Sequence, residues 1–363
     1  MEFDGKVLSG GEKLSYSLLS LYGKYGYGQY RMSKFEEYSL YGKNIDFLVS
    51  DSVITFTESN GRLMALKPDV TLSIVKNTRG DPSGVKRVCY SENVYRVPKG
   101  GDSFKEIKQV GLECLGDVDA CLTGEVLTLA EKSLALTGRE YALSVSHLGL
   151  LSLSFDRVTK DAAVKNRLMK CAGEKNVHGI KEICAFCNAG EDAVNAALGL
   201  VSVYGAPDKV FPVFGSLPLD EEQKRMLDEL KNVLSVFQGT EAEKRVTVDF
   251  SVTADENYYD GVVFRGFVEG VPESVLSGGS YGKLMKKMGK NSRAVGFAVY
   301  VDSLKRLYAE REEYDFDVML VYNDETPPSE LQKETEKIIS SGRSVFCCKR
   351  KDGGVRCRET AVL

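Results

Sequence analysis

Apolar positions recur along this chain with two periods, and each period predicts one kind of secondary structure. In residues 10–27 (GGEKLSYSLLSLYGKYGY), apolar side chains such as Leu18 and Tyr22 recur at helical spacing, which predicts an amphipathic helix. Helical periodicity returns in 120–138. It then dominates 154–244, where acids stand near segment starts and glycine near segment ends. The middle of the chain is therefore predicted to be a helical block.

Short apolar runs bounded by turn residues predict strands on both sides of that block. Residues 53–57 and 63–66 flank the Asn60-Gly61 pair, which is typical of a hairpin turn. The Gly-rich SGGSYG segment is predicted to be a tight turn, and VDSLKRLYAERE a helix. Further strands are expected in KRVCYSENVYRV, SFKEIKQVGLECLG, YALSVSH, KRVTVDFSV, YYDGVVFRGFV and AVGFAVY.

Strands on both sides of the block predict one α+β core rather than two separate domains. This core would be built from residues 1–153 and 245–312, with the helical block 154–244 inserted between its halves. The last segment, 313–363, has the pattern β-α-β-β and is small for an independent domain.

The composition is that of an ordinary soluble protein, with 43% hydrophobic and 28% charged residues in 363. A net charge of -4 argues against a protein whose whole surface binds nucleic acid. No apolar run approaches the roughly 20 residues that span a bilayer, and the first residues lack a secretory signal. The nine cysteines are therefore expected to be reduced thiols in a cytoplasm.

Pro68-Asp69 stands between an apolar lead-in and the helical stretch VTLSIVKN. From the residues alone, the simplest role of Asp69 is to cap that helix. The alternative is that its carboxylate and the Thr71 hydroxyl face a pocket and bind an ammonium group. Arg96 ends a predicted strand and precedes a Gly-rich loop with Lys99. It is either a solvated strand end or a cation aimed at a phosphate or carboxylate.

Gln109 and Glu113 lie four residues apart in a predicted strand, so both side chains are expected on one face. Gly111 between them would let a ligand approach that face closely. Because the intervening residues already form an apolar face, a polar ligand is favoured slightly over solvent as the partner of the amide and the acid.

Tyr258 and Tyr259 are expected at the start of the strand YYDGVVFRGF. They are either one core and one surface residue, or one phenol lines a pocket. The single CAFC pair, Cys184 and Cys187, lacks a second ligand pair, so no metal site is expected, and no motif predicts a cofactor. Together the candidates suggest a pocket for a small zwitterionic ligand but define no reaction.

These segments, taken in order, resemble the catalytic domain of histidyl-tRNA synthetase, a class II synthetase fold, over most of residues 10–310. The resemblance implies an antiparallel sheet flanked by helices and a dimer formed through the first motif, near Tyr25 to Tyr38. The matching segments are LYGKYGYGQYRMSKFEEY, ALKPDVT, RVCYSENVYRV, SFKEIKQVGLECLG, YYDGVVF, SGGSYGKL and AVGFAVYVDSL.

Two arginines that the synthetase family uses in amino-acid activation are missing from this sequence. Ala254 stands at one of these positions and Ser303, after Asp302, at the other. The family's Gly-Gly-Arg-Tyr-Asp-Gly loop has Ser280 and Gly282 here, and the anticodon-binding part is missing or much reduced. Since each such cation supplies several kcal/mol to the transition state, adenylate formation should be nearly abolished.

The chain is similar to a paralogous family, the regulatory subunit of ATP phosphoribosyltransferase, in YYDGVVF, LSVSHLGLL and the helical insertion. That resemblance implies a non-catalytic subunit in the first step of histidine biosynthesis. It also implies a short-form catalytic subunit as partner in a hetero-oligomer, and L-histidine as feedback effector. The residues then expected to bind histidine are Asp69, Thr71, Arg96, Gln109, Glu113, Tyr258 and Tyr259.

Two alternatives compete with this interpretation. The chain could be a divergent histidyl-tRNA synthetase or another amino-acid-activating ligase, against which the missing arginines argue. It could also sense a different amino acid or an uncharged tRNA. The negative net charge and the reduced C-terminal part count against tRNA.

Overall fold

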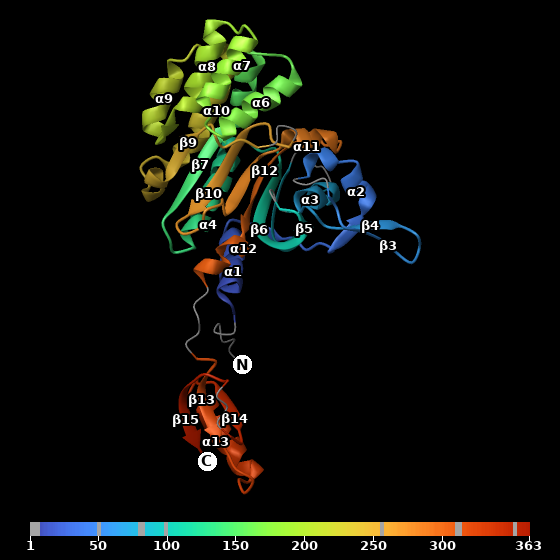
Figure 1. The fold of residues 1–363 in the computed structure, drawn as a ribbon, viewed down its shortest axis with the longest axis vertical. Helices are drawn as coiled ribbons and strands as arrows, with labels where there is room; N and C mark the ends of the chain where they lie inside the picture. Colours follow the sequence, from blue (N-terminus) through green and yellow to red (C-terminus); the bar gives the residue numbers. More distant parts are fainter. Residues whose placement is uncertain are drawn as a thin grey trace. The chain divides into compact units, whose positions relative to one another are not determined.

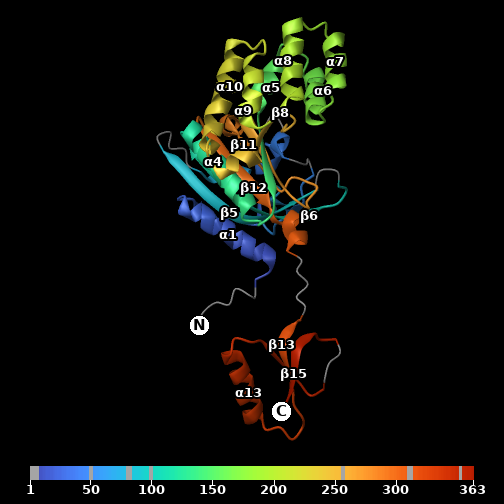
Figure 2. The ribbon, with the colours of Figure 1, turned by 90° about the vertical axis from the view of Figure 1, so that its left-hand side faces the viewer.

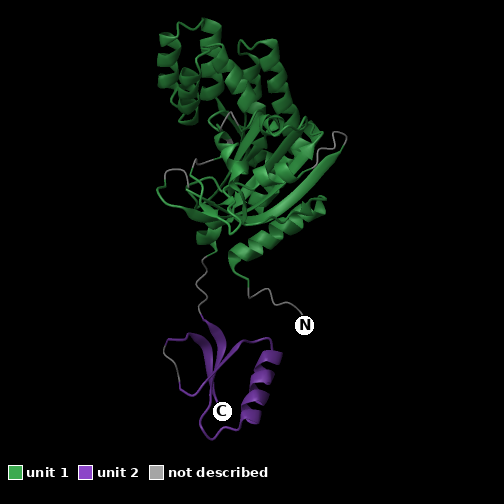
Figure 3. Cartoon of the chain, turned by 90° about the vertical axis from the view of Figure 1, so that its right-hand side faces the viewer, with its two compact units in different colours: residues 1–308 green, residues 309–363 purple. Residues whose placement is uncertain are grey.

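The structure, a computed structural model, describes residues 8–48, 52–78, 84–97, 101–254, 258–308, 314–350 and 354–363. The chain divides into two compact units, Met1–Tyr308 and Ala309–Leu363 (Figure 3). The first unit contains two sheets and the second unit contains one.

A mixed nine-stranded sheet forms the centre of the first unit (Figure 1). Its strand order is β1-β5-β6-β12-β11-β10-β7-β9-β8, and most neighbours are antiparallel. The antiparallel sheet flanked by helices that the sequence predicted is thereby confirmed. The strands are β1 (Gly28–Gln29), β5 (Val85–Arg96), β6 (Lys105–Gly116), β7 (Tyr141–His147), β8 (Tyr204–Gly205), β9 (Val246–Asp249), β10 (Val262–Val268), β11 (Leu276–Ser280) and β12 (Arg293–Tyr300).

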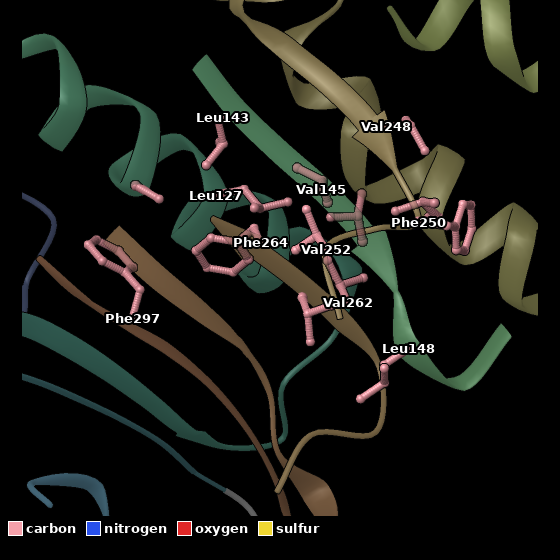
Figure 4. Close-up of a cluster of buried hydrophobic side chains, with 14 of the residues drawn as sticks. Leu127, Leu143, Val145, Leu148, Val248, Phe250, Val252, Val262, Phe264 and Phe297 are labelled. Carbon is pink, nitrogen blue, oxygen red and sulfur yellow. The ribbon is translucent and has the colours of Figure 1, made fainter. Parts of the chain in front are cut away.

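One face of this sheet is apolar and is covered by helices α1 (Gly10–Lys24) and α4 (Ala120–Ala135). Figure 2 shows α1 lying along β5, and Figure 4 shows Leu127 of α4 among Val145, Phe264 and other side chains of this core. Tyr22 of α1 meets Phe297 edge-on, with ring centroids 5.8 Å apart. Because strand side chains alternate between faces, the residues next to these apolar ones point to the opposite face.

A small three-stranded sheet beside the main one holds the segment that leads to Asp69. Its order is β2-β4-β3, from β2 (Phe35–Glu37), β3 (Thr55–Thr57) and β4 (Leu63–Leu66). The hairpin predicted around Asn60-Gly61 is confirmed, and Gly61 has φ +83°, where glycine is favoured. Helices α2 (Tyr38–Gly42) and α3 (Thr71–Asn77) belong to the same part, which has a second apolar core.

Six helices and the short strand β8 lie between the neighbouring parallel strands β7 and β9. Figure 1 shows α6 to α10 gathered beyond one end of the sheet. The division of the first unit into a core and an insertion at the predicted boundaries stays a prediction. The helices are α5 (Leu148–Asp156), α6 (Ala162–Gly173), α7 (Val177–Phe186), α8 (Glu191–Ser202), α9 (Pro207–Gly215) and α10 (Glu221–Leu234).

Three local predictions were wrong. The SGGSYG segment is not a tight turn, because Leu276–Ser280 forms the central strand β11 and Gly282–Lys287 the short helix α11. Strand β10 begins at Val262, so Tyr258 and Tyr259 precede it instead of opening it. The helix expected over 301–312 is not continuous, because α12 (Val301–Leu304) passes into a 3-10 turn, Lys305–Leu307, and residues 309–312 lie outside the described residues.

The second unit is a three-stranded parallel sheet with one helix, in the predicted order β-α-β-β. Its elements are β13 (Phe316–Val321), α13 (Pro328–Ser340), β14 (Val345–Cys348) and β15 (Cys357–Val362), and β13 is the middle strand. Val318, Leu320 and Ile338 form its small core. None of the helices in the described parts of the chain has both the length and the apolar character needed to cross a bilayer.

Candidate functional site

A cavity of about 1180 Å³ lies on the polar face of the main sheet. Its wall includes strand residues from β5, β6, β10, β11 and β12, and side chains from α3 and α6. A volume of this size slightly exceeds the roughly 300–1,000 Å³ of typical small-molecule sites, so it has room for a small ligand. All seven residues predicted to bind a ligand line it: Asp69, Thr71, Arg96, Gln109, Glu113, Tyr258 and Tyr259.

Glycines on the middle strands leave space above the cavity floor for side chains of other residues. A Cβ at Gly296 would lie 1.8 Å from Glu113 Oε2, and one at Gly279 would lie 2.8 Å from Tyr259 Cδ1. A Cβ at Gly111 would lie 2.6 Å from the Tyr90 hydroxyl oxygen. These glycines therefore leave room for the polar side chains of the site. Two of them, Gly279 and Gly296, belong to the SGGSYG and GFAVY segments.

Glu113 is the buried acid at the centre of the site. Its side chain is only 2% exposed, Thr71 donates its hydroxyl to Oε1 over 2.8 Å, and Tyr281 donates its phenol to Oε2 over 2.6 Å. Burial raises the pKa of Glu113 to about 8, although both hydrogen bonds favour the carboxylate. The neighbouring Asp69 raises this pKa further. Glu113 is thus poised to lose its proton when a cationic or hydrogen-bond-donating group arrives.

Asp69 both accepts a hydrogen bond at the start of α3 and lines the cavity, while its binding of an ammonium group stays a prediction. It lies one residue before Val70, the residue that precedes α3, and its Oδ1 accepts a hydrogen bond from the Leu72 N–H at 2.8 Å. The same half-buried carboxylate lines the cavity. Burial raises the pKa of Asp69, while the Leu72 N–H and the positive charge of Arg96 oppose that rise. The helix start therefore fixes the orientation of an acid in the cavity wall.

Gln109 and Arg96 present polar groups to the cavity. Gln109 is 5% exposed and Arg96 is 9% exposed. Within the described ranges, neither side chain forms a hydrogen bond or an ion pair with the protein. Buried polar groups of this kind normally have partners, so a polar ligand is the natural complement. Lys99, which the sequence linked to Arg96, lies outside the described residues.

Aromatic rings enclose the side of the cavity near Glu113. The rings of Tyr258 and Tyr259 lie 4.6 Å apart, and Tyr281 lies 5.8 Å from Tyr258. Burial raises the pKa of all three phenols well above the usual value, so they are hydrogen-bonding groups and not anions. Sequence reasoning missed Tyr281, because the segment that holds it was interpreted only as a turn.

The positions that lack the synthetase arginines also line the cavity. Ala254 and Ser303 contribute no charge there. Beside Ser303, Asp302 accepts the Lys108 N–H at 2.6 Å and pairs with Lys305 at 2.6 Å. Lys305 therefore balances the charge of Asp302, and neither Ala254 nor Ser303 replaces the missing cations.

A Gly296→Ala variant tests whether the glycine floor is required. We expect a loss of about 1–3 kcal/mol in the free energy of unfolding, because the new methyl group overlaps Glu113 and the Leu112 carbonyl. Urea denaturation followed by circular dichroism measures this. Gly23→Ala, at a helix position with nothing within 4 Å, is the control and should not destabilise the protein. Equal stability of the two variants would contradict the prediction.

The histidyl-tRNA synthetase family model matches residues 9–304 of this chain. The chain belongs to the histidyl-tRNA synthetase family. Within it, the chain is 25% identical over 309 residues to the ATP phosphoribosyltransferase regulatory subunit of Acetivibrio thermocellus, covering 83% of this chain and 74% of that protein. The predicted resemblance to this regulatory subunit is therefore confirmed.

Solved structures of this family share the fold. One is described as an ATP phosphoribosyltransferase regulatory subunit/histidyl-tRNA synthetase from Bacillus halodurans C, with TM-score 0.82, 22% identity, and coverage of 97% of this chain and 93% of that one. Another belongs to an ATP phosphoribosyl transferase complex from Thermotoga maritima, with TM-score 0.62, 17% identity, and coverage of 83% and 98%. At these identities the likeness shows the fold alone.

Proposed function

We propose that this chain is the regulatory subunit of an ATP phosphoribosyltransferase and binds L-histidine in the cavity described above. The observation that carries the proposal is the combination of groups in one wall. The acids Asp69 and Glu113, the amide of Gln109 and the tyrosines are present, while Ala254 and Ser303 stand where the synthetase family has arginines. Such a site can bind an amino acid without activating it.

The loss of activation follows from the charge of the site. Adenylate formation needs cations where negative charge develops on the transferring phosphate, and each missing cation costs several kcal/mol. Ala254 and Ser303 supply none, and the nearby Lys305 is already paired with Asp302. A divergent synthetase, the rival function, predicts histidine-dependent exchange of pyrophosphate into ATP, and absence of that exchange would exclude it.

Regulation would act through a coupling free energy between the histidine site and a partner. The partner is a short-form catalytic subunit, and the relative from Acetivibrio thermocellus is named as the regulatory subunit of that enzyme. A second copy of the chain would pair through residues 25–38, which include the exposed strands β1 and β2. The complex would act in the cytoplasm, and tRNA is not expected to bind.

The direct test mixes the purified full chain with a short-form catalytic subunit and measures phosphoribosyl transfer from phosphoribosyl pyrophosphate to ATP. We expect the rate to increase on mixing and L-histidine to inhibit the mixture more strongly than the catalytic subunit alone. The regulatory-subunit proposal fails if neither the rate nor the inhibition changes. Bovine serum albumin at the same concentration is the control for nonspecific stabilisation.

A further inference from the structure

The proposed histidine site requires a cation for the ligand's carboxylate. A zwitterionic amino acid carries one positive and one negative group, and buried charges need partners of opposite sign. Asp69 and Glu113 can hold the positive or hydrogen-bond-donating parts, but Ala254 offers nothing to the carboxylate. The inference below rests on the proposed function, because it concerns how the same cavity holds its ligand.

The register of the sheet places Arg265 at one end of a row of small residues. Arg265 of β10 pairs with Ser277 of β11, Ser277 with Ala298 of β12, and Ala298 with Gly111 of β6. Paired residues of antiparallel strands point to the same face, so this row runs across the cavity floor. Its three small members leave space between the arginine on β10 and the strand that holds Glu113, where the Tyr90 hydroxyl lies over Gly111 and the Tyr300 hydroxyl beside Ser277.

The next row places Glu113 on the same face of the sheet. There Val263 of β10 pairs with Gly279 of β11, Gly279 with Gly296 of β12, and Gly296 with Glu113 of β6. Glu113 thus stands at the β6 side of the floor, and Arg265 stands at the β10 side. A cation and an acid on opposite sides of the cavity floor match the two ends of a small zwitterion.

The contacts of Arg265 hold it at the cavity wall with donors to spare. Its Nη2 donates to the Thr253 carbonyl at 2.6 Å, and both residues line the cavity beside Ala254. An arginine side chain has five N–H donors, so four are not used by this bond. Among the residues with described positions, Arg265 forms no ion pair. No carboxylate of the described residues thus pairs with this charge, and the Thr253 carbonyl holds it next to the position where the family's arginine is missing.

The other cations of the cavity are less suited to this task. The positive charge of Arg96 acts on Asp69, whose carboxylate it helps to keep ionised. Lys305 is already paired with Asp302, and its side chain is 69% exposed. Lys170 of α6 has a side chain that is 77% exposed, and Lys105 and Arg306, which also line the cavity, are exposed as well. A guanidinium also binds a carboxylate through two parallel hydrogen bonds, which an ammonium cannot do.

We propose that Arg265 determines the ligand specificity of this cavity by binding the α-carboxylate of histidine. Its guanidinium replaces, from strand β10, the cation that Ala254 does not provide. The imidazole and ammonium groups then lie toward Glu113 and Asp69. The cavity consequently selects an amino acid over the corresponding amine.

The test compares L-histidine with histamine, which has the imidazole and ammonium groups but no carboxylate. Isothermal titration calorimetry on the full chain should show tighter binding of L-histidine. In Arg265→Met, L-histidine affinity should fall by about 10- to 100-fold, the range for a charge-assisted hydrogen bond, while histamine affinity stays the same. Arg265→Lys keeps the charge but cannot form the bidentate hydrogen bonds. It should therefore show an intermediate loss of L-histidine affinity.

The control variant is Lys305→Met, which removes another cavity cation and should preserve the preference for L-histidine. The proposal is overturned if Arg265→Met keeps the wild-type preference, or if Arg96→Met abolishes it while Arg265→Met does not. Should Arg265→Met fail to fold, an unchanged preference in Arg265→Lys overturns it. Wild-type protein that binds neither ligand would instead overturn the histidine-binding function itself.

Discussion

A Lys67→Met variant is expected to lose about 3 kcal/mol of its free energy of unfolding. Lys67 is completely buried, and its Nζ lies 2.8 Å from Oε2 of Glu92, whose side chain is 17% exposed. Removing the ammonium leaves a carboxylate that is largely withdrawn from water and has lost its counter-charge. The expected loss is at the lower end for a broken buried pair because Glu92 keeps some contact with solvent.

Urea denaturation of the variant measures this loss, and a double variant tests its cause. Adding Glu92→Gln to Lys67→Met removes the unpaired charge and should restore part of the stability. Lys224→Met, which breaks a surface pair with Glu221, is the matched control and should change stability little. If Lys67→Met is as stable as the control, the buried pair does not stabilise the fold.

The same variant should also weaken histidine binding, because Lys67 anchors the segment that carries Asp69. Its backbone N–H donates a hydrogen bond to the Lys34 carbonyl at 3.0 Å, and its own carbonyl accepts one from the Tyr95 N–H at 2.9 Å. The buried ammonium adds a third attachment, to strand β5. Pro68 and Asp69 follow directly, so this lysine positions the acid that the proposed ligand meets.

The parts of the fold that the sequence predicted depend on local signals. Asn60-Gly61 marks a hairpin because its backbone preference suits the turn, and residues 10–27 show a helical stripe that α1 buries. Gln109 and Glu113 share a face because strand side chains alternate. Their common face could therefore be predicted without any knowledge of neighbouring strands, whereas their burial could not, because the sequence left open whether that face meets solvent.

The parts that the sequence did not predict depend on pairing between distant strands. The glycines of SGGSYG look like a turn, yet they form β11, because β10 and β12 flank it and the cavity above requires small residues. Arg265 looks like an ordinary strand arginine. Only the register of four strands shows that it shares a row with Ser277, Ala298 and Gly111. Neither the strand formed by the SGGSYG glycines nor the row that Arg265 shares has a signal in the local sequence.

A Glu113→Gln variant is expected to bind L-histidine about 10- to 100-fold more weakly than the wild type, because it removes the charge on a buried hydrogen-bond acceptor. It should also change how stability depends on pH. The ordinary pKa of this acid is 4.5, and burial raises it to about 8 in the fold. Between these values the folded protein holds a proton that the unfolded chain has lost.

The sign of the pH effect follows from that proton. The wild type has the full stability contribution of protonated Glu113 below about pH 4.5 and loses it as the pH rises toward about 8. The loss is on the order of a few kcal/mol. Glutamine is neutral at every pH, so the variant should lack this loss. Urea denaturation at pH 5 and pH 8 compares the two proteins, and parallel pH profiles would contradict the assignment.

Histidine binding should then release a proton from Glu113 near neutral pH, because an imidazole or ammonium group beside it stabilises the carboxylate. Calorimetry in two buffers of different ionisation enthalpy counts the protons released by the wild type. Glu113→Gln retains Asp69 and the ligand's own titration, so the difference between the two proteins isolates Glu113. Equal proton release would show that the buried acid does not meet the ligand, and a larger release by the wild type would place histidine against it.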